Sequence, residues 1–250
     1  PEAVAFYSGH PTSFSTNTGV AHGGFMKAIG SRKAYGPSSQ DGASRLLANQ
    51  ILFGASLPIP IPDLEECDFL IILGANPLVS NGSFLYAPRI RHDLDAIAAR
   101  KGVVVVDPRR TETARSYEHV AIRPGGDVWL LLGLLRVLFE EGLADRAALQ
   151  SHAVGHERLE AEIMRLDLDA VAKRSSVEIE TIRALARRYA NSPRAAVYGR
   201  LGLCRGKYGT LTNFLATALD LVGGKFGVRG GTLFGYPVLA RQPGSGADGY

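Results

Sequence analysis

The chain has 250 residues, of which 46% are hydrophobic and 21% are charged, with a formal net charge of +4. This composition is typical of a globular protein with a sizeable core, built as one large α/β domain or two smaller ones. The positive excess is compatible with phosphate ligands but too small to indicate a nucleic-acid-binding protein. The two cysteines, Cys67 and Cys204, lie far apart and support no disulfide framework, zinc site or iron–sulfur motif.

The amino-terminal part of the chain is predicted to alternate short elements with polar loops. A strand over residues 3–7 enters a loop at 8–19, and a short helix is expected near 20–29. A second polar loop at 35–42 leads into a helix over 42–53, whose apolar residues recur at helical spacing.

Two buried parallel strands follow. Residues 69–73 and 103–106 are apolar, largely β-branched runs that stop at Gly74 and at Asp107. Residues 85–100 form a plausible crossover helix, so this segment is predicted as a strand–helix–strand unit. Ligands collect at the carboxyl ends of strands in open α/β sheets, and we therefore expect the functional residues after Gly74 and Asp107.

A third short strand at 120–122 precedes a region, 128–191, that is predicted to be almost wholly helical. Its apolar run 128–139 is too short to cross a membrane, so no membrane-spanning segment is expected. Ser175 and Glu178 fit a capping box at the start of the last helix of this region.

A late strand over 195–198 ends at Gly199, a helix is expected over 209–222, and residues 224–235 are predicted as a loop. The first and the late strand share one format, a strand that enters a glycine-containing polar loop and then a helix. We therefore expect them to be neighbours in one sheet.

The predicted fold class is α/β, with two Rossmann-like three-layer α/β/α domains, one inserted in the other. Residues 1–36 and 193–250 would form a discontinuous domain around an inserted domain of residues 37–192. The chain starts at Pro1 and ends in a Pro/Gly/Ser-rich stretch, so we expect a piece of a longer polypeptide. No signal peptide is visible, and a cytoplasmic location is favoured although the true amino terminus is expected to be missing.

Acidic and amide side chains follow the predicted strands. The Asp107 carboxylate can accept two parallel hydrogen bonds from guanine or bind ribose hydroxyls, or it can simply cap the helix that Pro108 would begin. Asn76 offers an amide to a ligand, or is a turn residue tolerated in a left-handed conformation. Asp127 either binds a base edge or caps the helix that follows it.

Glycines and arginines at the same loops suit phosphate. Gly74 permits a ligand to approach closely, and Arg109 with Arg110 could neutralise a pyrophosphate or form an exposed solvated pair. A flexible loop that could cradle phosphate, but without the spacing of a dinucleotide fingerprint, contains Gly199, Gly202, Gly206 and Gly209.

The six histidines do not cluster. His152 and His156 have the spacing of an i, i+4 pair on one helix, but no His-Glu-x-x-His pattern is present, which favours a surface pair over a metal site. No Gly-x-Ser-x-Gly elbow supports serine nucleophile catalysis.

Five ordered segments together resemble the molybdopterin oxidoreductases of the dimethyl sulfoxide reductase family, which includes formate dehydrogenases and periplasmic nitrate reductases. These segments are residues 68–77, 106–114, 122–127, 198–202 and 221–231. Three stretches depart from the family pattern, at 204–207, 223–225 and 229–231. In the family, which binds two dinucleotide cofactors, these stretches contribute contacts to the second one.

The resemblance implies that the chain helps to bind two molybdopterin guanine dinucleotides that chelate molybdenum or tungsten. It implies that Asn76 contacts a phosphate or ribose, that Asp107 and Asp127 contact guanine or its ribose, and that Arg109 lies at the pyrophosphate. The residues that would face the other dinucleotide are Gly199, Arg200, Gly202 and Gly209.

The family often supplies a cysteine, selenocysteine, serine or aspartate ligand to the metal. The matching stretch here, residues 35–42, has no cysteine, and counting back from residues 52–54 places Asp41 at the ligand position. Asp41 is thus the candidate metal ligand and catalytic residue; the alternative is that it caps the helix over 42–53.

By resemblance, the parent protein would carry out two-electron redox chemistry or oxygen-atom transfer on a small molecule, with an electron-transfer partner and a [4Fe–4S] centre outside this chain. The isolated piece would be inactive. A rival interpretation is a non-catalytic homologue in an electron-transfer complex that keeps the fold without molybdenum. A nicotinamide-dependent dehydrogenase is placed last because its glycine fingerprint is absent.

Overall fold

The computed structural model describes residues 3–9, 15–82, 85 and 87–235. They divide into two compact units, Pro1–Ala43 and Ser44–Tyr250, which are described separately. The first unit contains a two-stranded parallel sheet and two helices. Its elements are β1 (Phe6–Tyr7), α1 (Thr16–Ile29), β2 (Ala34–Tyr35) and α2 (Ser38–Asp41).

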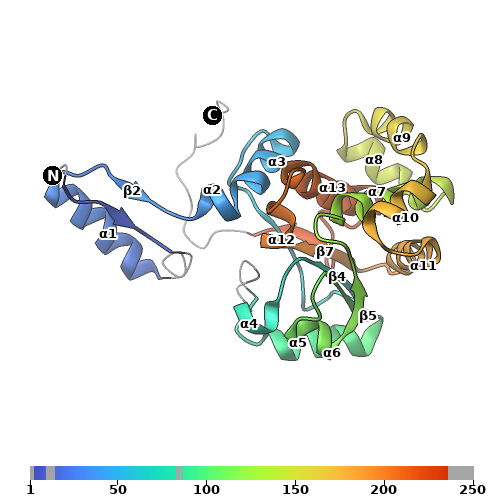
Figure 1. The fold of residues 1–250 in the computed structure, drawn as a ribbon, viewed down its shortest axis with the longest axis horizontal. Helices are drawn as coiled ribbons and strands as arrows, with labels where there is room; N and C mark the ends of the chain where they lie inside the picture. Colours follow the sequence, from blue (N-terminus) through green and yellow to red (C-terminus); the bar gives the residue numbers. More distant parts are fainter. Residues whose placement is uncertain (1–2, 10–14, 83–84, 86, 236–250) are drawn as a thin grey trace. The chain divides into compact units, whose positions relative to one another are not determined.

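The second unit holds the larger sheet, shown with its helices in Figure 1. After α3 (Ala43–Phe53), which begins at the unit boundary, its strands are β3 (Pro60–Pro62), β4 (Phe69–Leu73), β5 (Gly102–Asp107), β6 (Glu118–Ala121), β7 (Ala195–Gly199) and β8 (Thr232–Phe234). Its helices are α4 (Pro77–Ser80), α5 (Ile90–Arg100), α6 (Glu112–Ser116), α7 (Asp127–Glu140), α8 (Arg146–His152), α9 (His156–Met164), α10 (Leu168–Ser175), α11 (Ile179–Ala190), α12 (Leu201–Cys204) and α13 (Gly209–Val222).

Four strands form a parallel sheet in the order β6-β5-β4-β7. Every residue of the central strand β4 is buried. Because alternate residues of a strand point to opposite sides, β4 is therefore covered on both faces. Phe69, Ile71 and Leu73 join one core with α7, α11 and α13, and Leu70 and Ile72 join another with α5. This three-layer α/β/α arrangement confirms the predicted strand–helix–strand unit.

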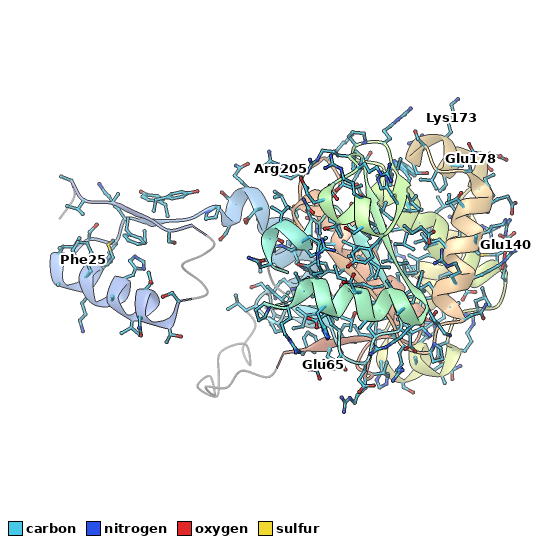
Figure 2. The ribbon with its side chains drawn as sticks, turned by 90° about the horizontal axis from the view of Figure 1, so that it is seen from below. Phe25, Glu65, Glu140, Lys173, Glu178 and Arg205 are labelled. Atoms are coloured by element: carbon cyan, nitrogen blue, oxygen red, sulfur yellow. The ribbon has the colours of Figure 1, made fainter. Side chains whose placement is uncertain are left out.

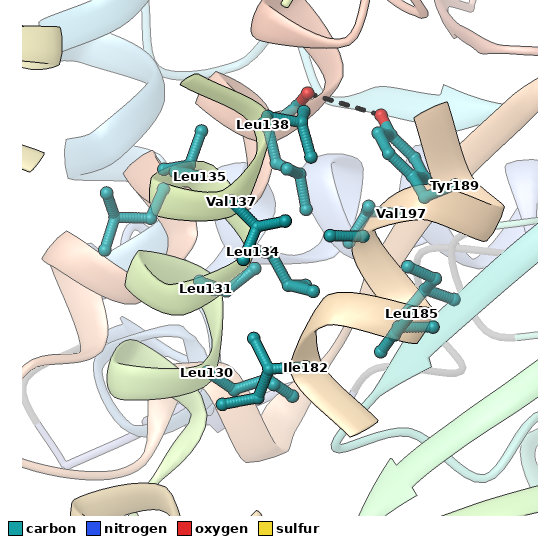
Figure 3. Packing of buried hydrophobic residues seen from close by; sticks show 14 of the residues in the cluster. Leu130, Leu131, Leu134, Leu135, Val137, Leu138, Ile182, Leu185, Tyr189 and Val197 are labelled. Carbon is teal, nitrogen blue, oxygen red and sulfur yellow. Dashed lines mark hydrogen bonds between the residues drawn. The ribbon is translucent and has the colours of Figure 1, made fainter. Parts of the chain in front are cut away.

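The helical layer between β6 and β7 confirms the prediction for residues 128–191, and α7 lies at its centre. Figure 3 shows Leu130, Leu134 and Leu138 of α7 packed with side chains of α11. Gly133 leaves room for α10 and α11, since a Cβ there would lie 2.9 Å from Val171 Cγ1 and 3.1 Å from Ile182 Cγ2. The outer faces carry charged side chains; Glu140, Lys173 and Glu178 are labelled in Figure 2.

The predicted neighbour relation between the first and the late strand is wrong. β7 pairs with β4, with Leu73 opposite Gly199, while β1 pairs with β2. The format of a strand and its loop is local and does not specify which strand lies beside it. The predicted separation of residues 193–250 from residues 37–192 has no counterpart in this pairing.

Residues 224–235, predicted as a loop, contain a strand. β8 pairs antiparallel with β3, with Ile61 opposite Leu233. A three-residue strand is too short for a period-2 pattern to identify it. Its position is fixed instead by a buried contact, because Thr232 Oγ1 donates to Asp220 Oδ2 at 2.6 Å.

The predicted capping box is also wrong. Ser175 is the last residue of α10, and its Oγ accepts a hydrogen bond from the Val177 amide at 3.3 Å. The next helix, α11, has Glu178 at its N-cap without a side-chain cap. Ser176, at φ 62°, places a left-handed residue between the two helices, so the motif spans a helix end rather than a helix start.

Candidate functional site

The carboxyl ends of β4, β5 and β7 lie side by side at one edge of the sheet. The register pairs Leu73 of β4 with Val106 of β5 and with Gly199 of β7. The loops after these strands therefore begin next to one another. This arrangement brings the predicted residues of three separate segments to one edge, where open α/β sheets bind ligands.

Two of these loops cross at a pair of glycines. A Cβ on Gly202 would lie 2.5 Å from Gly74 Cα, and a Cβ on Gly74 would lie 2.6 Å from Gly202 Cα. The Gly202 amide donates to the Gly74 carbonyl at 3.0 Å, and Gly74 has φ +55°. Both positions therefore need glycine, for contact between backbones as well as for conformation.

Asn76 is held by the first turn of α6, the helix that follows β5. Its Oδ1 accepts hydrogen bonds from Thr113 Oγ1 at 2.7 Å and from the Thr113 amide at 3.2 Å, and its Nδ2 donates to Glu112 Oε2 at 2.7 Å. The alternative of a left-handed turn residue is wrong, because Asn76 has φ −127°. Asn76 therefore joins the loop after β4 to α6. The spacing of these residues in the sequence did not indicate this contact.

Asp107 does not cap a helix. β5 extends to Asp107, and α6 begins only at Glu112, where Thr111 is the N-cap and accepts from the Ala114 amide at 3.1 Å. One oxygen of Asp107, Oδ1, accepts from the Arg109 amide at 2.8 Å. The exposed Arg109 side chain lies 3.5 Å from Glu112 Oε2.

Asp127 is the first residue of α7 and is only 7% exposed. Burial raises the pKa of its carboxyl group to about 6; its own amide opposes that rise, and the nearby charge of Asp107 adds to it. The helix-cap alternative for Asp127 is wrong as stated, since Gly126 occupies the N-cap position.

A cavity of about 140 Å³ lies between this carboxyl group and the loop after β7. Asp127 and Gly202 line it together with Arg205, Lys207 and Tyr208. Arg205 and Lys207 are exposed, and Figure 2 labels Arg205. The cavity thus joins a buried carboxyl group to basic and aromatic side chains, a set that suits a base carrying phosphate.

The loop after β7 is attached to α3. A Cβ on Gly209 would lie 2.6 Å from the Cys204 carbonyl oxygen and 2.7 Å from Ser44 Oγ, so glycine is required there for packing. Ser44 Oγ donates to the same carbonyl at 3.3 Å, and Arg45 Nη1 donates to the Gly199 carbonyl at 3.0 Å. Gly199 and Arg200 therefore also lie at this edge.

Arg45 of α3 also reaches this edge of the sheet, through its bond to the Gly199 carbonyl. Burial lowers the pKa of its guanidinium, and Arg200 lowers it further, while Tyr198 and Cys204 oppose the change. Its place on an ordinary amphipathic helix gave no signal. Only the packing of α3 against β7 shows that it reaches the sheet edge.

Asp41 is the last residue of α2 and belongs to the first unit, so the structure does not relate it to the sheet edge. Asp41 ends one helix and does not begin the next, which contradicts the cap alternative over 42–53. Within the described residues, no group of three or more His, Cys, Asp or Glu side chains could hold a metal ion. His152 ends α8 and His156 begins α9, so they are not a pair on one helix.

The family model described as molybdopterin oxidoreductase matches residues 1–243 of this chain. The chain belongs to this family. Among curated molybdopterin oxidoreductases, it is 27% identical over 171 residues to the F420-dependent formate dehydrogenase 2 subunit alpha of Methanococcus maripaludis, covering 67% of this chain and 24% of that relative.

Two further relatives have similar identities. Formate dehydrogenase H of Escherichia coli is 28% identical over 168 residues, covering 67% of this chain and 23% of the relative. A nitrate reductase of Shewanella frigidimarina is 28% identical over 173 residues, covering 67% and 18%. The chain thus spans about a quarter or less of these molybdopterin oxidoreductases.

The fold is shared with a solved structure, acetylene hydratase from Pelobacter acetylenicus. The TM-score is 0.71 at 24% sequence identity, covering 85% of this chain and 28% of the other. No helix among the described residues is both long and apolar enough to cross a bilayer.

Proposed function

We propose that the sheet edge formed by β4, β5 and β7 binds a molybdopterin guanine dinucleotide in a molybdenum- or tungsten-dependent oxidoreductase. The observation that carries this proposal is the buried Asp127 carboxyl group, which lines a cavity together with Gly202, Arg205 and Lys207 of the segment after β7. A carboxylate in that place needs hydrogen-bond donors, and guanine offers N1–H and an exocyclic amine side by side.

The other residues of the edge suit the rest of such a ligand. At Gly74 and Gly202 the main chains of two loops lie against each other without a Cβ between them, so backbone groups are exposed to a ligand at this edge. Arg109 and Arg200 carry guanidinium groups that can pair with a pyrophosphate. Asn76 accepts from the Thr113 amide and so fixes the start of α6, which follows Arg109. When bound, the cofactor supplies the redox-active metal, while these residues hold and orient it.

For the whole protein we propose two-electron redox chemistry or oxygen-atom transfer on a small molecule, similar to formate dehydrogenase or nitrate reductase. Its similarity to two formate dehydrogenases and a nitrate reductase supports this class. A second dinucleotide faced by Gly199, Arg200, Gly202 and Gly209, a [4Fe–4S] centre, an electron-transfer partner and a cytoplasmic location belong to the same proposal. The division into two Rossmann-like domains also belongs to this proposal. Because β7 pairs with β4, both strands must lie in the same domain.

Asp41 stays a proposed metal ligand. A carboxylate oxygen is a hard donor that suits oxidised molybdenum. In the metal-loaded full-length protein, Asp41→Ala is expected to change the electron paramagnetic resonance or X-ray absorption signature of the metal while pterin content is retained. An unchanged signature contradicts the assignment.

The proposal is tested by the composition of the full-length protein. Purified wild-type protein is expected to contain molybdenum or tungsten, a pterin, and guanosine monophosphate released by acid hydrolysis. Asp127→Asn is expected to lower the released nucleotide several-fold, whereas Asp169→Asn, an exposed residue of α10, leaves it unchanged. A folded wild-type protein with no metal and no pterin would instead support the rival non-catalytic homologue.

A further inference from the structure

Four elements of the second unit meet at one buried carboxyl group. Asp220 of α13 is 2% exposed, and its Oδ2 accepts a hydrogen bond from Thr232 Oγ1 of β8 at 2.6 Å. Its Oδ1 accepts from Tyr189 Oη of α11 at 2.7 Å. The main-chain amide of Val197 in β7, an edge strand of the four-stranded sheet, also donates to this carboxyl group. Asp220 therefore connects β8 to the core.

The hydroxyl group of Tyr189 has a second acceptor beside it. Its Oη lies 3.3 Å from the Leu219 carbonyl oxygen, to which it can also donate. A hydroxyl group has one proton to donate and can accept a hydrogen bond on its own oxygen. When Asp220 is protonated, its hydroxyl can donate to Tyr189 Oη while the tyrosine proton turns to the Leu219 carbonyl. Both charge states of Asp220 therefore find hydrogen-bond partners with these heavy atoms in place.

Burial favours the protonated state of this carboxyl group. It raises the pKa of Asp220 to about 7, while the hydrogen bonds that Asp220 accepts and the charge of Lys225 oppose the rise. Burial also raises the pKa of the Tyr189 hydroxyl well above its usual value and the pKa of the Cys67 thiol to about 12, so both groups stay protonated near neutral pH. Burial lowers the pKa of Lys225, and the charges of Asp145 and Asp220 oppose that change.

We propose that Asp220 is a pH-sensitive latch, which holds β8 against the core while it is protonated and loosens β8 when it ionises. The ionised carboxyl group is cut off from water while β8 is closed, and it regains water when Thr232 moves away, so ionisation favours the open state. Opening would also reshape a cavity of about 460 Å³, to which β8 contributes Leu233 and Phe234. This inference does not rest on the cofactor assignment.

The competing explanation is that Asp220 is a fixed acceptor, ionised at every working pH and balanced by Lys225. A fixed carboxylate gives β8 a protection against hydrogen exchange that does not change with pH, once the chemical exchange rate is corrected for. A latch loses protection as the pH rises from about 4 to about 7, because over this range the open state has released a proton that the closed state retains.

The test is hydrogen–deuterium exchange of the full-length protein between pH 5 and pH 8. The reporters are the amides of Gly227 and Thr232, which donate to the carbonyl oxygens of Thr232 and Lys225 at 2.8 Å. Their protection should fall by up to roughly a hundredfold between pH 5 and pH 7, since one proton gives about tenfold per pH unit, and should then level off. The amides of β5 should remain more protected than β8 at pH 8, which would show that β8 opens separately.

Asp220→Asn imitates the protonated carboxyl group, because its amide nitrogen can donate to Tyr189 Oη while its oxygen accepts from Thr232. We expect this variant to keep β8 protected at pH 8 and to abolish the pH dependence. The matched control Asp169→Asn, at an exposed position of α10, should keep the wild-type profile.

The wild-type profile keeps the proposal refutable if Asp220→Asn does not fold. Thr232→Val then serves as a second variant, since loss of the bond between β8 and Asp220 should lower β8 protection at pH 5 by roughly tenfold. The proposal is overturned if wild-type β8 protection does not change between pH 5 and pH 8, or if β8 is as protected as β5 throughout. A wild-type profile in Asp220→Asn, or unchanged protection in Thr232→Val, would overturn it as well.

Discussion

At the scale of single residues, Asp127 combines a proposed binding role with a cost to the folded state. Its carboxyl group is buried, and its pKa is raised to about 6. A raised carboxyl pKa means that the folded state holds a proton which the unfolded state has released. Stability from this group is therefore greatest below pH 4 and falls as the pH rises towards 6.

Asp127→Asn should remove this pH dependence. In the protein without cofactor, we expect the variant to be more stable than wild type at pH 8 by roughly 2–3 kcal/mol, at about 1.4 kcal/mol per pKa unit. Denaturant unfolding between pH 4 and pH 8 measures the difference. Equal slopes for the variant and the wild type would show that Asp127 is not a desolvated carboxyl group.

Asp220 lies in a second buried polar cluster, away from the proposed ligand. Tyr189 Oη donates to its Oδ1 at 2.7 Å and Thr232 Oγ1 donates to its Oδ2 at 2.6 Å, while burial raises its pKa to about 7. Asp220→Ala would leave the buried Thr232 hydroxyl without this acceptor and Tyr189 Oη with only the Leu219 carbonyl at 3.3 Å, and we expect a loss of about 3 kcal/mol in the free energy of unfolding.

Thr232→Val separates the parts of this effect. It removes only the contact between β8 and Asp220, so a smaller loss of about 1–2 kcal/mol is expected from chemical denaturation. If both variants unfold like the wild type, the cluster does not hold β8 to the core.

The residue scale also shows what sequence could predict about the site. Asp107, Asp127, Gly74 and Asn76 were selected because they follow strands, and the structure brings them to one edge. Their hydrogen-bond partners were not foreseen, because the Asn76–Thr113 contact joins residues that are 37 positions apart. The contact of Arg45 with the Gly199 carbonyl was not foreseen for the same reason, since the two residues are 154 positions apart.

At the scale of elements, the loop after β4 and the loop after β7 depend on one contact. Gly202→Ala would place a Cβ 2.5 Å from Gly74 Cα, and relief requires the two strand ends to separate. We expect a loss of roughly 2–3 kcal/mol in the free energy of unfolding and a lower content of bound nucleotide.

The matched control is Gly24→Ala in the middle of α1, where a Cβ would meet no atom within 4 Å. Alanine favours helix over glycine, so this change should be neutral or stabilise by up to about 1 kcal/mol. Equal stability of the Gly202 and Gly24 variants would contradict the close crossing.

Elements themselves were predictable where their signal is local. The runs at 69–73 and 103–106 became β4 and β5, and the apolar segment 128–139 became most of α7. The errors arose where one local motif has two meanings. Asp107 and Pro108 resemble a helix start, but parallel pairing of Asp107 with Ala121 extends the strand instead.

At the scale of the whole molecule, binding and stability should be linked. A ligand that binds only the folded state stabilises it, by about 2.7 kcal/mol at one hundred times its dissociation constant. Protein prepared without cofactor should therefore unfold several degrees below the loaded protein in a calorimetric scan. Equal unfolding temperatures would mean that the cofactor does not contact the cooperative core.

Whole-molecule organisation was the hardest part to predict. The order β6-β5-β4-β7 places a strand from the end of the chain beside the first strand of the strand–helix–strand unit. Only long-range packing selects this neighbour, because Ala195–Gly199 has the same apolar character as any buried strand. Fold class followed from composition and pattern, but strand order did not.

The crossing of Gly74 with Gly202 has a consequence for how this protein can vary. An enlarged residue in a core is often tolerated when a neighbour becomes smaller, but no residue is smaller than glycine. Neither position can compensate for a change at the other, so in a randomised library we expect both to return as glycine in every folded clone. New specificities would then have to arise from the side chains around this fixed point.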